Sequence, residues 1–488
     1  MTTLYRQNLT LLTDLYQLTM AYAYWKTGLA DREAVFHLSF RKKPFQGGYA
    51  IACGLETACE LLSGFGFDDE SLSYLASLAG NDGKPLFEPG FLDYLADLRL
   101  GCDVHAVPEG SVVFPHEPLL RIKGPIAQCQ IVETPLLNCI NFETLIATKA
   151  ARICLAARGD PVLEFGLRRA QGADGGLHAS RAAFVGGCSS TSNVLAGRLF
   201  DIPVKGTHAH SWVMCFDDEL SAFEAYAAAM PNNCVFLVDT YDTIQGVHHA
   251  IQVGEQLRAQ GHEMVGIRLD SGDLAFLSIE ARKLLNEADF ADAAILASND
   301  LDEHIISSLK QQGATIAVWG VGTKLATAFD QPALGGIYKL SAIRDEKGLW
   351  QHRLKLSEQA IKISTPGMLQ VRRYYSEGGE PVGDCIFDEI LGMPAAGVTI
   401  VDPSDSTRRK SVPADAWCED LLLPAFEAGR RVYDPPGARA ARERSQRELG
   451  RFHAGIKRLV HPHQYPVGLE KGLSELKHRL ICEARGIE

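Results

Sequence analysis

The sequence has no excess of positive charge, no long apolar run and no closely spaced pair of cysteines. Its 488 residues include 48 lysines and arginines against 60 aspartates and glutamates, which gives a net charge of −12. A protein that binds nucleic acids broadly needs a basic surface to neutralise phosphates, so this balance argues against that class. No apolar stretch is long enough to span a bilayer.

The twelve cysteines are scattered, and no two of them form a Cys-x-x-Cys pair. In a chain of this length they are typical of reduced, mostly buried thiols in a cytosolic protein. The N-terminal region carries Asp14 inside its only apolar run, so it does not have the pattern of a signal peptide. We therefore expect a cytoplasmic protein.

The chain also lacks a Walker-type phosphate loop, so any ATP must be bound by another arrangement of residues. It contains no low-complexity segment and no repeat beyond the alternation of strands and helices described below. Hydrophobic residues make up 46% of the composition. This is ample for a large core and, with the chain length, indicates roughly two to three domains.

The two ends of the chain show mixed helix and strand patterns. Toward the N-terminus we expect helices over 8–25, 56–64 and 133–158, strands over 34–40 and 48–55, and β-structure over 103–123. Toward the C-terminus we expect strands over 368–375 and 381–390, a polar connector over 402–413, and an exposed helix over 438–451.

The middle of the chain alternates apolar segments of strand length with amphipathic helices. The expected strands are 162–165, 202–204, 234–238, 264–269, 294–297 and 315–318. The expected helices are 192–199, 219–230, 243–260, 274–287 and 302–312. Strands that are apolar on both faces and separated by helices predict a parallel sheet, and their number favours a barrel over an open sheet.

Each expected strand ends in a polar cluster, at the edge where α/β proteins bind ligands. The clusters are Glu164–Arg169, Gly206–Ser211, Asp239–Thr243, Arg268–Asp273, Ser298–Asp300 and Gly320–Lys324. Helix capping can account for Thr243, Asp273 and Asp302. It does not account for Arg168 or Arg268, whose planar guanidinium groups suit a carboxylate or a phosphate.

The residue types in these clusters indicate a particular chemistry. An unprotonated histidine such as His208 or His210 is a good nucleophile toward phosphorus. The carboxylates of Asp239 and Asp270 suit Mg²⁺ or ribose hydroxyls, and glycine pairs let backbone N–H groups turn toward an anion. We therefore expect a phosphorylated sugar, a metal, an acidic small molecule and a histidine nucleophile at one site.

Taken in order, these clusters resemble those of the nicotinate phosphoribosyltransferase family. The matching segments are Leu11–Gln17, Glu164–Gly172, Gly206–Ser211, Asp239–Thr243, Arg268–Asp273, Gly320–Thr323 and Pro462–Val467. The similarity runs nearly end to end, and the ordered set is specific although each motif alone is weak.

The resemblance implies an α/β fold class, an irregular (β/α) barrel with a second α+β domain built from the N- and C-terminal parts. Residues 1–130 would form the N-terminal α+β part of the flanking domain, and 131–345 the central α/β barrel with the active site. Residues 346–488 would form the C-terminal part of the flanking domain plus a helical tail.

The resemblance also implies an ATP-coupled, ligase-type phosphoribosyl transfer. Nicotinate, 5-phosphoribosyl-1-pyrophosphate, ATP and water would give nicotinate mononucleotide, pyrophosphate, ADP and phosphate, as the first step of NAD salvage from nicotinate. The reaction would pass through a phosphohistidine and use Mg²⁺ as cofactor. A homodimer with shared active sites is expected, with no nucleic-acid or membrane partner.

Site roles follow from the resemblance by motif. The catalytic residues would be His210, as the phosphohistidine, with Asp270 and Arg268. Arg268 and Thr207 would hold the substrate carboxylate. Phe165 and Tyr16 of the partner subunit would stack on the pyridine ring, and Arg168 would contact an anionic substrate. Asp239 and Asp270 would contact the ribose hydroxyls or a metal, and Ser211 would lie beside the histidine. The 5-phosphate would bind to Gly320, Gly322 and Thr323.

Two positions near the histidine bear on specificity. Position 208 often holds an apolar residue in this family, whereas this chain has His208, so the sequence leaves open which imidazole is phosphorylated. The related nicotinamide phosphoribosyltransferase has an aspartate directly after its Gly-Thr. Its absence here favours the acid over the amide, because a carboxylate would repel nicotinate.

Two other functions remain open from the sequence. Quinolinate phosphoribosyltransferase shares the fold class, but it releases CO₂ and needs no phosphohistidine. A non-catalytic paralogue that serves as a binding or scaffold protein is the other alternative. It is disfavoured because every strand-end cluster keeps its polar groups.

Overall fold

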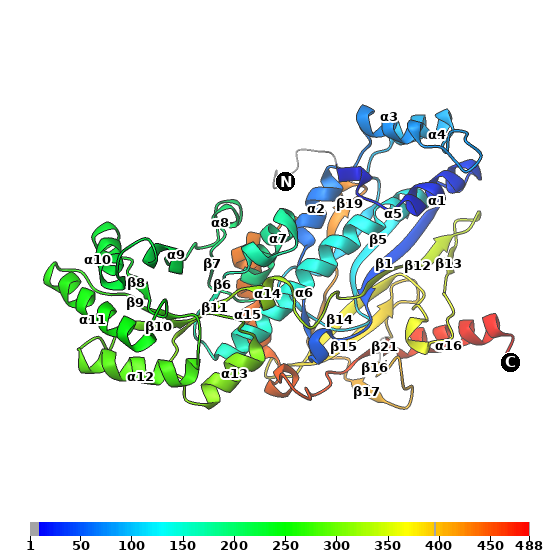
Figure 1. The fold of residues 1–488 in the computed structure, drawn as a ribbon. Helices are drawn as coiled ribbons and strands as arrows, with labels where there is room; N and C mark the ends of the chain where they lie inside the picture. Colours follow the sequence, from blue (N-terminus) through cyan, green and yellow to red (C-terminus); the bar gives the residue numbers. More distant parts are fainter. Residues whose placement is uncertain (1–8, 395–396, 488) are drawn as a thin grey trace. The chain divides into compact units, whose positions relative to one another are not determined.

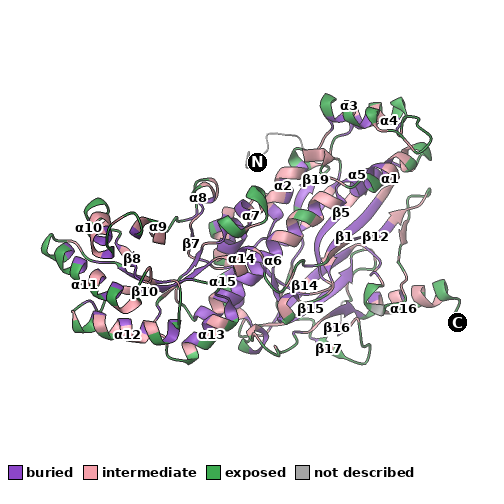
Figure 2. Cartoon of the chain, in the orientation of Figure 1, coloured by how far each residue is buried: buried purple, intermediate pink, exposed green. Residues whose placement is uncertain are grey.

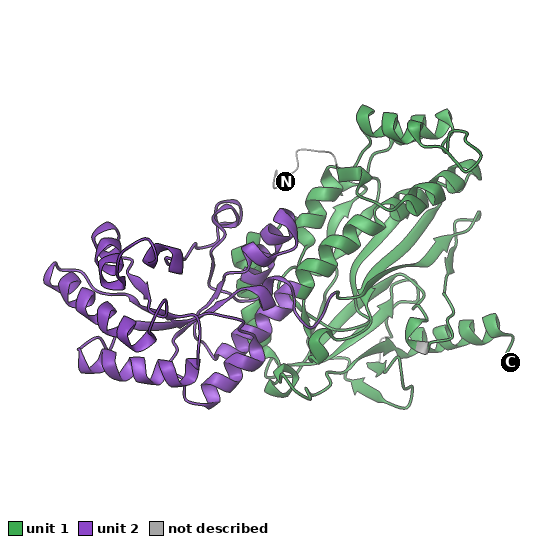
Figure 3. Cartoon of the chain, viewed as in Figure 1, with its two compact units in different colours: residues 1–145, 333–488 green, residues 146–332 purple. Residues whose placement is uncertain are grey.

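The computed structural model describes residues 9–394 and 397–487, and the chain divides into two compact units (Figures 1 and 3). Unit 1 comprises 1–145 and 333–488, and unit 2 comprises 146–332. Unit 1 thus draws on both ends of the chain. The boundaries expected from the sequence lie at 130/131 and 345/346.

Unit 2 is built on a six-stranded parallel sheet with the order β7-β6-β11-β10-β9-β8. Its strands are β6 (Val162–Glu164), β7 (Ser190–Thr191), β8 (Val235–Leu237), β9 (Gly266–Leu269), β10 (Ala294–Ala297) and β11 (Val318–Val321). They are short and mostly buried, and all except β7 are mainly apolar, as a sheet covered on both faces requires. The order is open, with β7 and β8 as end strands, so the expected barrel is a half-barrel.

Helices connect the strands of unit 2 and bury one face each. They are α7 (Gly172–Val185), α8 (Val194–Phe200), α9 (His210–Val213), α10 (Glu219–Ala229), α11 (Thr243–Ala259), α12 (Leu274–Glu287), α13 (Glu303–Gln311) and α14 (Thr323–Ala326), with the 3₁₀ turn η3 (Leu167–Arg169). In α11 the buried residues recur every three or four positions, and exposed residues lie between them (Figure 2). Aspartates cap four of these helices, namely Asp218 for α10, Asp242 for α11, Asp273 for α12 and Asp302 for α13. Thr243, expected to be a cap, is instead the first residue of α11.

Unit 1 contains two large sheets. The seven-stranded antiparallel sheet has the order β13-β12-β1-β5-β3-β19-β20, and the six-stranded mixed sheet has the order β17-β16-β21-β15-β14-β18. The first consists of β1 (Glu33–Phe40), β3 (Asp103–Ala106), β5 (Pro118–Pro125), β12 (Gly336–Arg344), β13 (Trp350–His352), β19 (Leu423–Glu427) and β20 (Arg430–Arg431). The second consists of β14 (Leu369–Tyr375), β15 (Pro381–Asp388), β16 (Val398–Val401), β17 (Arg409–Val412), β18 (Cys418–Asp420) and β21 (Val467–Glu470).

The remaining elements of unit 1 are mostly helical, with one small hairpin. The helices are α1 (Leu15–Lys26), α2 (Leu55–Ser63), α3 (Asp69–Ser77), α4 (Pro89–Asp97), α5 (Ile126–Ile131), α15 (Gly437–Arg451) and α16 (Lys471–Arg485). Helix α6 (Glu133–Ala157) contains the boundary between the units. Short turns are η1 (Leu9–Leu11), η2 (Pro44–Gln46), η4 (Ala360–Lys362) and η5 (Ala454–Lys457), and the hairpin pairs β2 (Ala50–Ile51) with β4 (Val112–Val113).

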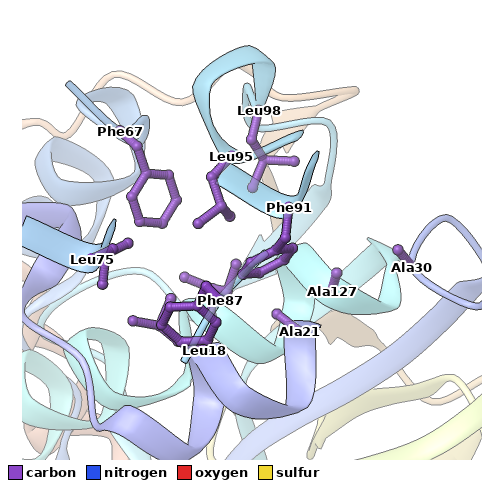
Figure 4. Packing of buried hydrophobic residues seen from close by; sticks show 11 residues of the cluster. Leu18, Ala21, Ala30, Phe67, Leu75, Phe87, Phe91, Leu95, Leu98 and Ala127 are labelled. Carbon is purple, nitrogen blue, oxygen red and sulfur yellow. The ribbon is translucent and has the colours of Figure 1, made fainter. Parts of the chain in front are cut away.

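An apolar cluster joins α1, α3, α4 and α5 (Figure 4). Phe87 and Phe91 are fully buried in it, with ring centroids 5.5 Å apart. Leu18 and Ala21 reach the cluster from one face of α1. This face explains why α1 is helical at the spacing that the sequence shows.

Several sequence-based elements need correction. The helix expected over 8–25 begins at Leu15, because the backbone of Asp14 is extended (φ −80°, ψ 149°) and separates α1 from the 3₁₀ turn η1. The strand expected over 48–55 is limited to β2, because Gly54 turns the chain with φ 99° and starts α2. A side chain at Gly54 would meet the backbone of Cys139 at 2.8 Å, so the turn requires glycine.

Three further corrections concern later elements. The strand expected over 202–204 is reduced to one parallel bridge, between Val204 and Thr191. The strand expected over 315–318 is β11, which lies three residues later in the chain. Helix α7 was not predicted, because the glycines at its start give no helical pattern. The helix expected to be exposed at 438–451 buries Ala441 and Leu449 on one face.

Within the part of the chain that the structure describes, no helix combines the length and the apolarity needed to cross a bilayer. The expected α/β fold class is confirmed.

Candidate active site

Polar side chains gather at the carboxyl ends of the parallel strands in unit 2. Asp239 comes after β8, and Ser298 follows β10. Arg268 lies near the end of β9, and Asp270 directly follows that strand. The loop after the Val204 bridge adds Thr207, and His210 is the first residue of α9. We call these six residues the strand-end cluster, and hydrogen bonds or an ion-pair contact link each of them to another member.

Arg268 is the centre of the strand-end cluster. Its Nε donates to Ser298 Oγ at 2.8 Å, its Nη1 to Thr207 Oγ1 at 2.9 Å, and its Nη2 to Asp270 Oδ1 at 2.8 Å. Only 13% of the side chain is exposed. A guanidinium held in three directions cannot rotate freely, so Arg268 presents a fixed positive group to a ligand.

Asp270 stays ionised in this setting. Burial alone would raise the pKa of its carboxyl group, but hydrogen bonds from Ser298 and Arg268 outweigh burial and hold the pKa below its ordinary value. The backbone N–H of Asp270 donates to Asp239 Oδ2 at 2.8 Å. The two aspartates are therefore fixed relative to each other.

His210 opens α9 and faces two polar partners. Its Nδ1 lies 3.1 Å from Thr240 Oγ1, and its Nε2 lies 3.8 Å from Asp270 Oδ2. Its side chain is 39% exposed, so it is accessible to a substrate. The carboxylate on the Nε2 side favours a proton on Nε2, which leaves the lone pair on Nδ1.

His208 has a different environment. It is buried, and its Nε2 accepts a hydrogen bond from the backbone N–H of Leu237 in β8 at 3.2 Å. Its ring packs edge-on against Tyr226, with centroids 4.8 Å apart, and burial lowers the pKa of the imidazole. The geometry therefore separates the two histidines, because His208 anchors the loop and only His210 is open.

Asp239 carries an oxygen suited to a ligand. Its Oδ2 accepts from the backbone N–H of Asp270 and from Ser271 Oγ at 2.6 Å. Its Oδ1 is buried, with no hydrogen-bond partner among the described residues. A buried carboxylate oxygen without a partner is costly, so this atom fits a hydroxyl group or a hard cation such as Mg²⁺.

Phe165 lies beside the guanidinium group of Arg268 and close to two glycines, Gly320 in β11 and Gly322 after it. Its ring centroid is 5.9 Å from Cζ of Arg268. A side chain at Gly320 would come within 2.9 Å of the Phe165 ring, and one at Gly322 would come within 3.2 Å of its backbone oxygen. Glycine at position 320 therefore makes room for the aromatic ring.

Glu164 joins three elements below the site, and the sequence assigned it no role. It is buried, its Oε2 accepts from Ser180 Oγ at 2.9 Å and Thr191 Oγ1 at 2.6 Å, and its Oε1 accepts from the N–H of Gly166. These bonds connect the ends of β6 and β7 with α7. The signal available in the sequence was a charged residue ending an apolar strand directly before Phe165.

Other expected site residues lie outside the strand-end cluster. Arg168 in η3 and Ser211 in α9 are exposed, and Thr323 is the first residue of α14. Tyr16 belongs to unit 1, on α1, and is 48% exposed. Burial, followed by the nearby carboxylate of Glu133, raises the pKa of its phenol. The roles expected for these four residues stay predictions.

Sequence reasoning did not give Ser298 and Thr240 a role in the site. Both belong to the polar segments that the sequence places after the expected strands, but their function depends on the side chains that they contact from neighbouring strands. Ser298 Oγ donates to Asp270 Oδ1 and accepts from Arg268, and Thr240 meets His210. Hydroxyl groups at strand ends were the available signal, and helix capping explains such groups equally well.

Three family profiles match the chain along most of its length. The profile of the nicotinate phosphoribosyltransferase N-terminal domain matches residues 11–141, the family profile matches 161–351, and that of the C-terminal domain matches 369–477.

Relatives and solved structures agree with these profiles. The chain is 43% identical to nicotinate phosphoribosyltransferase of Bacillus subtilis, over 98% of this chain and 96% of the relative, and 35% identical to that of Homo sapiens, over 97% and 96%. The crystal structure of human nicotinic acid phosphoribosyltransferase superimposes with a TM-score of 0.83 at 34% identity, covering 96% of this chain and 99% of that one. Nicotinate-nucleotide pyrophosphorylase from Pyrococcus furiosus shares the fold, with a TM-score of 0.66 at 22% identity, over 92% and 99%.

Proposed function

The chain belongs to the nicotinate phosphoribosyltransferase family, and from that membership we propose its reaction. The enzyme joins nicotinate to 5-phosphoribosyl-1-pyrophosphate and forms nicotinate mononucleotide and pyrophosphate, the first step of NAD salvage from nicotinate. The observation that carries this proposal is the strand-end cluster. It combines a fixed arginine, two carboxylates and an accessible histidine at one edge of the sheet. The cytoplasm is the location that the cysteine pattern favours.

Arg268 is suited to bind the carboxylate of nicotinate. An arginine side chain carries five N–H donors. Three of them donate to Ser298, Thr207 and Asp270, which leaves one on Nη1 and one on Nη2 for a ligand. Two N–H groups on one planar guanidinium match the two oxygens of a carboxylate. The Thr207 hydroxyl lies beside this pair. It donates to the backbone oxygen of His208 at 3.0 Å, so it would have to turn from that oxygen to donate to the carboxylate of nicotinate.

Phe165 supports the position of the pyridine ring. A carboxylate bound on Arg268 brings its ring close to the Phe165 ring, because the guanidinium carbon and the ring centroid are 5.9 Å apart. Stacking on a rigid aromatic surface orients the ring nitrogen toward the sugar and lowers the entropic cost of reaction. A homodimer would supply Tyr16 of the partner subunit as the second aromatic surface, with Arg168 facing the anionic substrates.

ATP coupling would act through His210. The Nδ1 lone pair attacks the γ-phosphorus of ATP, the bond from phosphorus to the β–γ bridging oxygen breaks, and ADP leaves with the electron pair. The Asp270 carboxylate, 3.8 Å from Nε2, favours a proton there and offsets the positive charge that develops on the ring. Water later cleaves the P–N bond and restores the neutral imidazole. The phosphoryl group adds negative charge beside the cluster while it is present, with Ser211 adjacent in the chain.

Asp239 and Asp270 would hold Mg²⁺ or the ribose hydroxyls. The unpartnered Oδ1 of Asp239 and the ionised Asp270 fit the oxygen ligands that Mg²⁺ prefers. When bound, Mg²⁺ would supply positive charge to the pyrophosphate oxygens. The carboxylates also favour the positive charge that builds on the ribose ring as the anomeric bond breaks. Gly320 in β11, with Gly322 and Thr323 directly after that strand, would bind the 5-phosphate, as the family motif implies.

Product analysis tests the proposal directly. Purified protein is mixed with nicotinate, 5-phosphoribosyl-1-pyrophosphate, Mg²⁺ and ATP, and nicotinate mononucleotide is measured. Quinolinate replaces nicotinate in a parallel reaction, with and without ATP. Product from quinolinate with release of CO₂ would favour the quinolinate phosphoribosyltransferase alternative. Absence of turnover with either acid would favour a non-catalytic paralogue.

A further inference from the structure

Two adjoining cavities lie in the C-terminal part of unit 1, between β16, β17, β21 and α16. They have volumes of about 490 Å³ and about 300 Å³, and both are lined by Asp402 and Arg409. We call the two together the basic pocket. All its lining residues belong to unit 1, and none of them belongs to the strand-end cluster.

The basic pocket is positively charged in an acidic chain. Two carboxylates, Asp402 and Glu475, line it together with six cations, so its local charge is +4 with histidine neutral, whereas the chain carries −12. The cations are Arg408, Arg409, Lys410, Lys471, Lys477 and Arg479. Two serine hydroxyls, those of Ser406 and Ser474, add hydrogen-bond donors, whereas the hydroxyl of Ser404 donates to Asp402 Oδ1 at 2.6 Å.

Three of the cations, Arg409, Lys410 and Lys477, contact no carboxylate within residues 9–394 and 397–487. Arg409 Nε donates to the backbone oxygen of Ser406 at 2.9 Å, and Lys477 Nζ donates to Thr365 Oγ1 at 3.1 Å. Lys410 Nζ donates to a backbone oxygen, and the other three cations contact carboxylates. A partly buried ammonium without an anion is costly, so a bound anion would stabilise this pocket.

Burial governs two titratable groups at this site. Burial lowers the pKa of Lys477 to about 8. Burial, then the charges of Lys477 and Arg41, lower the pKa of His116 to about 4, against an opposing effect of Asp402. Both shifts show that a positive charge is costly at these positions.

We propose that the basic pocket binds a small molecule through a di- or triphosphate group. A volume of about 490 Å³ lies within the range of small-ligand pockets, roughly 300–1,000 Å³. Cations that converge from β17 and α16 suit several phosphate groups better than one. A long nucleic acid is disfavoured, because the overall charge of the chain would repel it away from this pocket.

Hydrogen–deuterium exchange on the full chain tests this site without using catalysis. Inorganic phosphate, inorganic pyrophosphate and ATP are added separately, and exchange is followed in peptides from 398–412 and 471–485. We expect pyrophosphate and ATP at millimolar concentration to slow exchange in both segments, and phosphate to act more weakly. A nucleotide source and an inorganic source are distinguished by comparing ATP with pyrophosphate. Peptides from the strand-end cluster report separately on the proposed reaction site.

The variants make the test specific. Arg409→Gln with Lys477→Met should weaken the protection at 398–412 and 471–485 at least about tenfold in anion concentration, because charge-assisted hydrogen bonds are lost. Ser474→Glu keeps both cations but adds a carboxylate, and it should weaken protection as well. The matched control, Lys283→Met with Arg430→Gln, removes the same charges from exposed positions elsewhere and should behave as wild type. Absence of protection in the wild type, or equal protection in the double variant, would overturn the proposal whether or not the enzyme turns over nicotinate.

Discussion

Replacing Arg268 with lysine separates positive charge from the geometry of the guanidinium. Lysine keeps the charge but places its donors on one nitrogen, so it cannot reach Ser298, Thr207 and Asp270 together. The two N–H groups left for nicotinate become at most one. We therefore expect the variant to bind nicotinate poorly while its fold is retained.

The magnitude follows from the bonds that are lost. A hydrogen bond to a charged group contributes about 1.5–3 kcal/mol. Since about 1.4 kcal/mol corresponds to a factor of ten, the loss of one bond to nicotinate should raise its KM roughly 10- to 150-fold. The KM for 5-phosphoribosyl-1-pyrophosphate should change much less, because Arg268 is assigned to the carboxylate of the other substrate.

The assay is steady-state formation of nicotinate mononucleotide, with each substrate varied in turn. Arg258→Lys is the control, because Arg258 donates to Glu263 on an exposed part of unit 2 and should leave both KM values within about twofold. An unchanged KM for nicotinate together with a raised KM for the phosphoribosyl substrate would refute the assignment of Arg268.

Three further predictions concern single residues. His210→Ala should abolish phosphate incorporation from labelled ATP and ATP-stimulated synthesis while weak ATP-independent synthesis survives, whereas His208→Ala should mainly lower the melting temperature; labelling that persists in His210→Ala and is lost in His208→Ala would reverse the roles. His37 is buried, and burial followed by Arg121 lowers its pKa to about 3, so the unfolded chain binds one more proton between pH 6.5 and 3 and stability falls as pH falls through that window. The free energy of unfolding, measured by urea denaturation at several pH values, should therefore depend less on pH in His37→Gln, by up to one proton between pH 6.5 and 3. An unchanged slope of this free energy against pH would contradict the prediction. Glu164→Gln places an amide against three donors and should lower the unfolding free energy by about 1–3 kcal/mol, measured by chemical denaturation with the exposed Glu255→Gln as control; equal stability of the two variants would show that the network is not needed.

Much of unit 2 was predictable because its signals are local. Helix α12 begins and ends where the sequence predicts, since Asp273 caps it and its apolar residues recur at helical spacing. The strand-end residues were predictable because parallel strands present their carboxyl ends at one edge. The family resemblance added the ordered set of motifs, and the profiles confirm it.

What the sequence could not supply depends on contacts between distant residues. The roles of Ser298 and Thr240 require the register of neighbouring strands, which no local pattern contains. The strand expected at 315–318 lies later because Gly320 is strand rather than loop, and its lack of a side chain serves the Phe165 ring. Helix α15 was expected to be exposed because it is rich in arginine and glutamate. Its alanine face lies so near Gly110 that a side chain there would meet the oxygen of Ala441 at 2.0 Å.

The contact between His208 and the backbone of Leu237 limits how the neighbouring imidazole can move. Thr207 is hydrogen-bonded to Arg268 and His208 to β8, so the chain is held up to His208 and only Ala209 separates this point from His210. Any swing of His210 between a nucleotide and a sugar must then be accommodated at Ala209 or beyond it. One residue allows only a small movement, so an insertion or deletion in this loop would displace the His210 ring from Thr240 and Asp270.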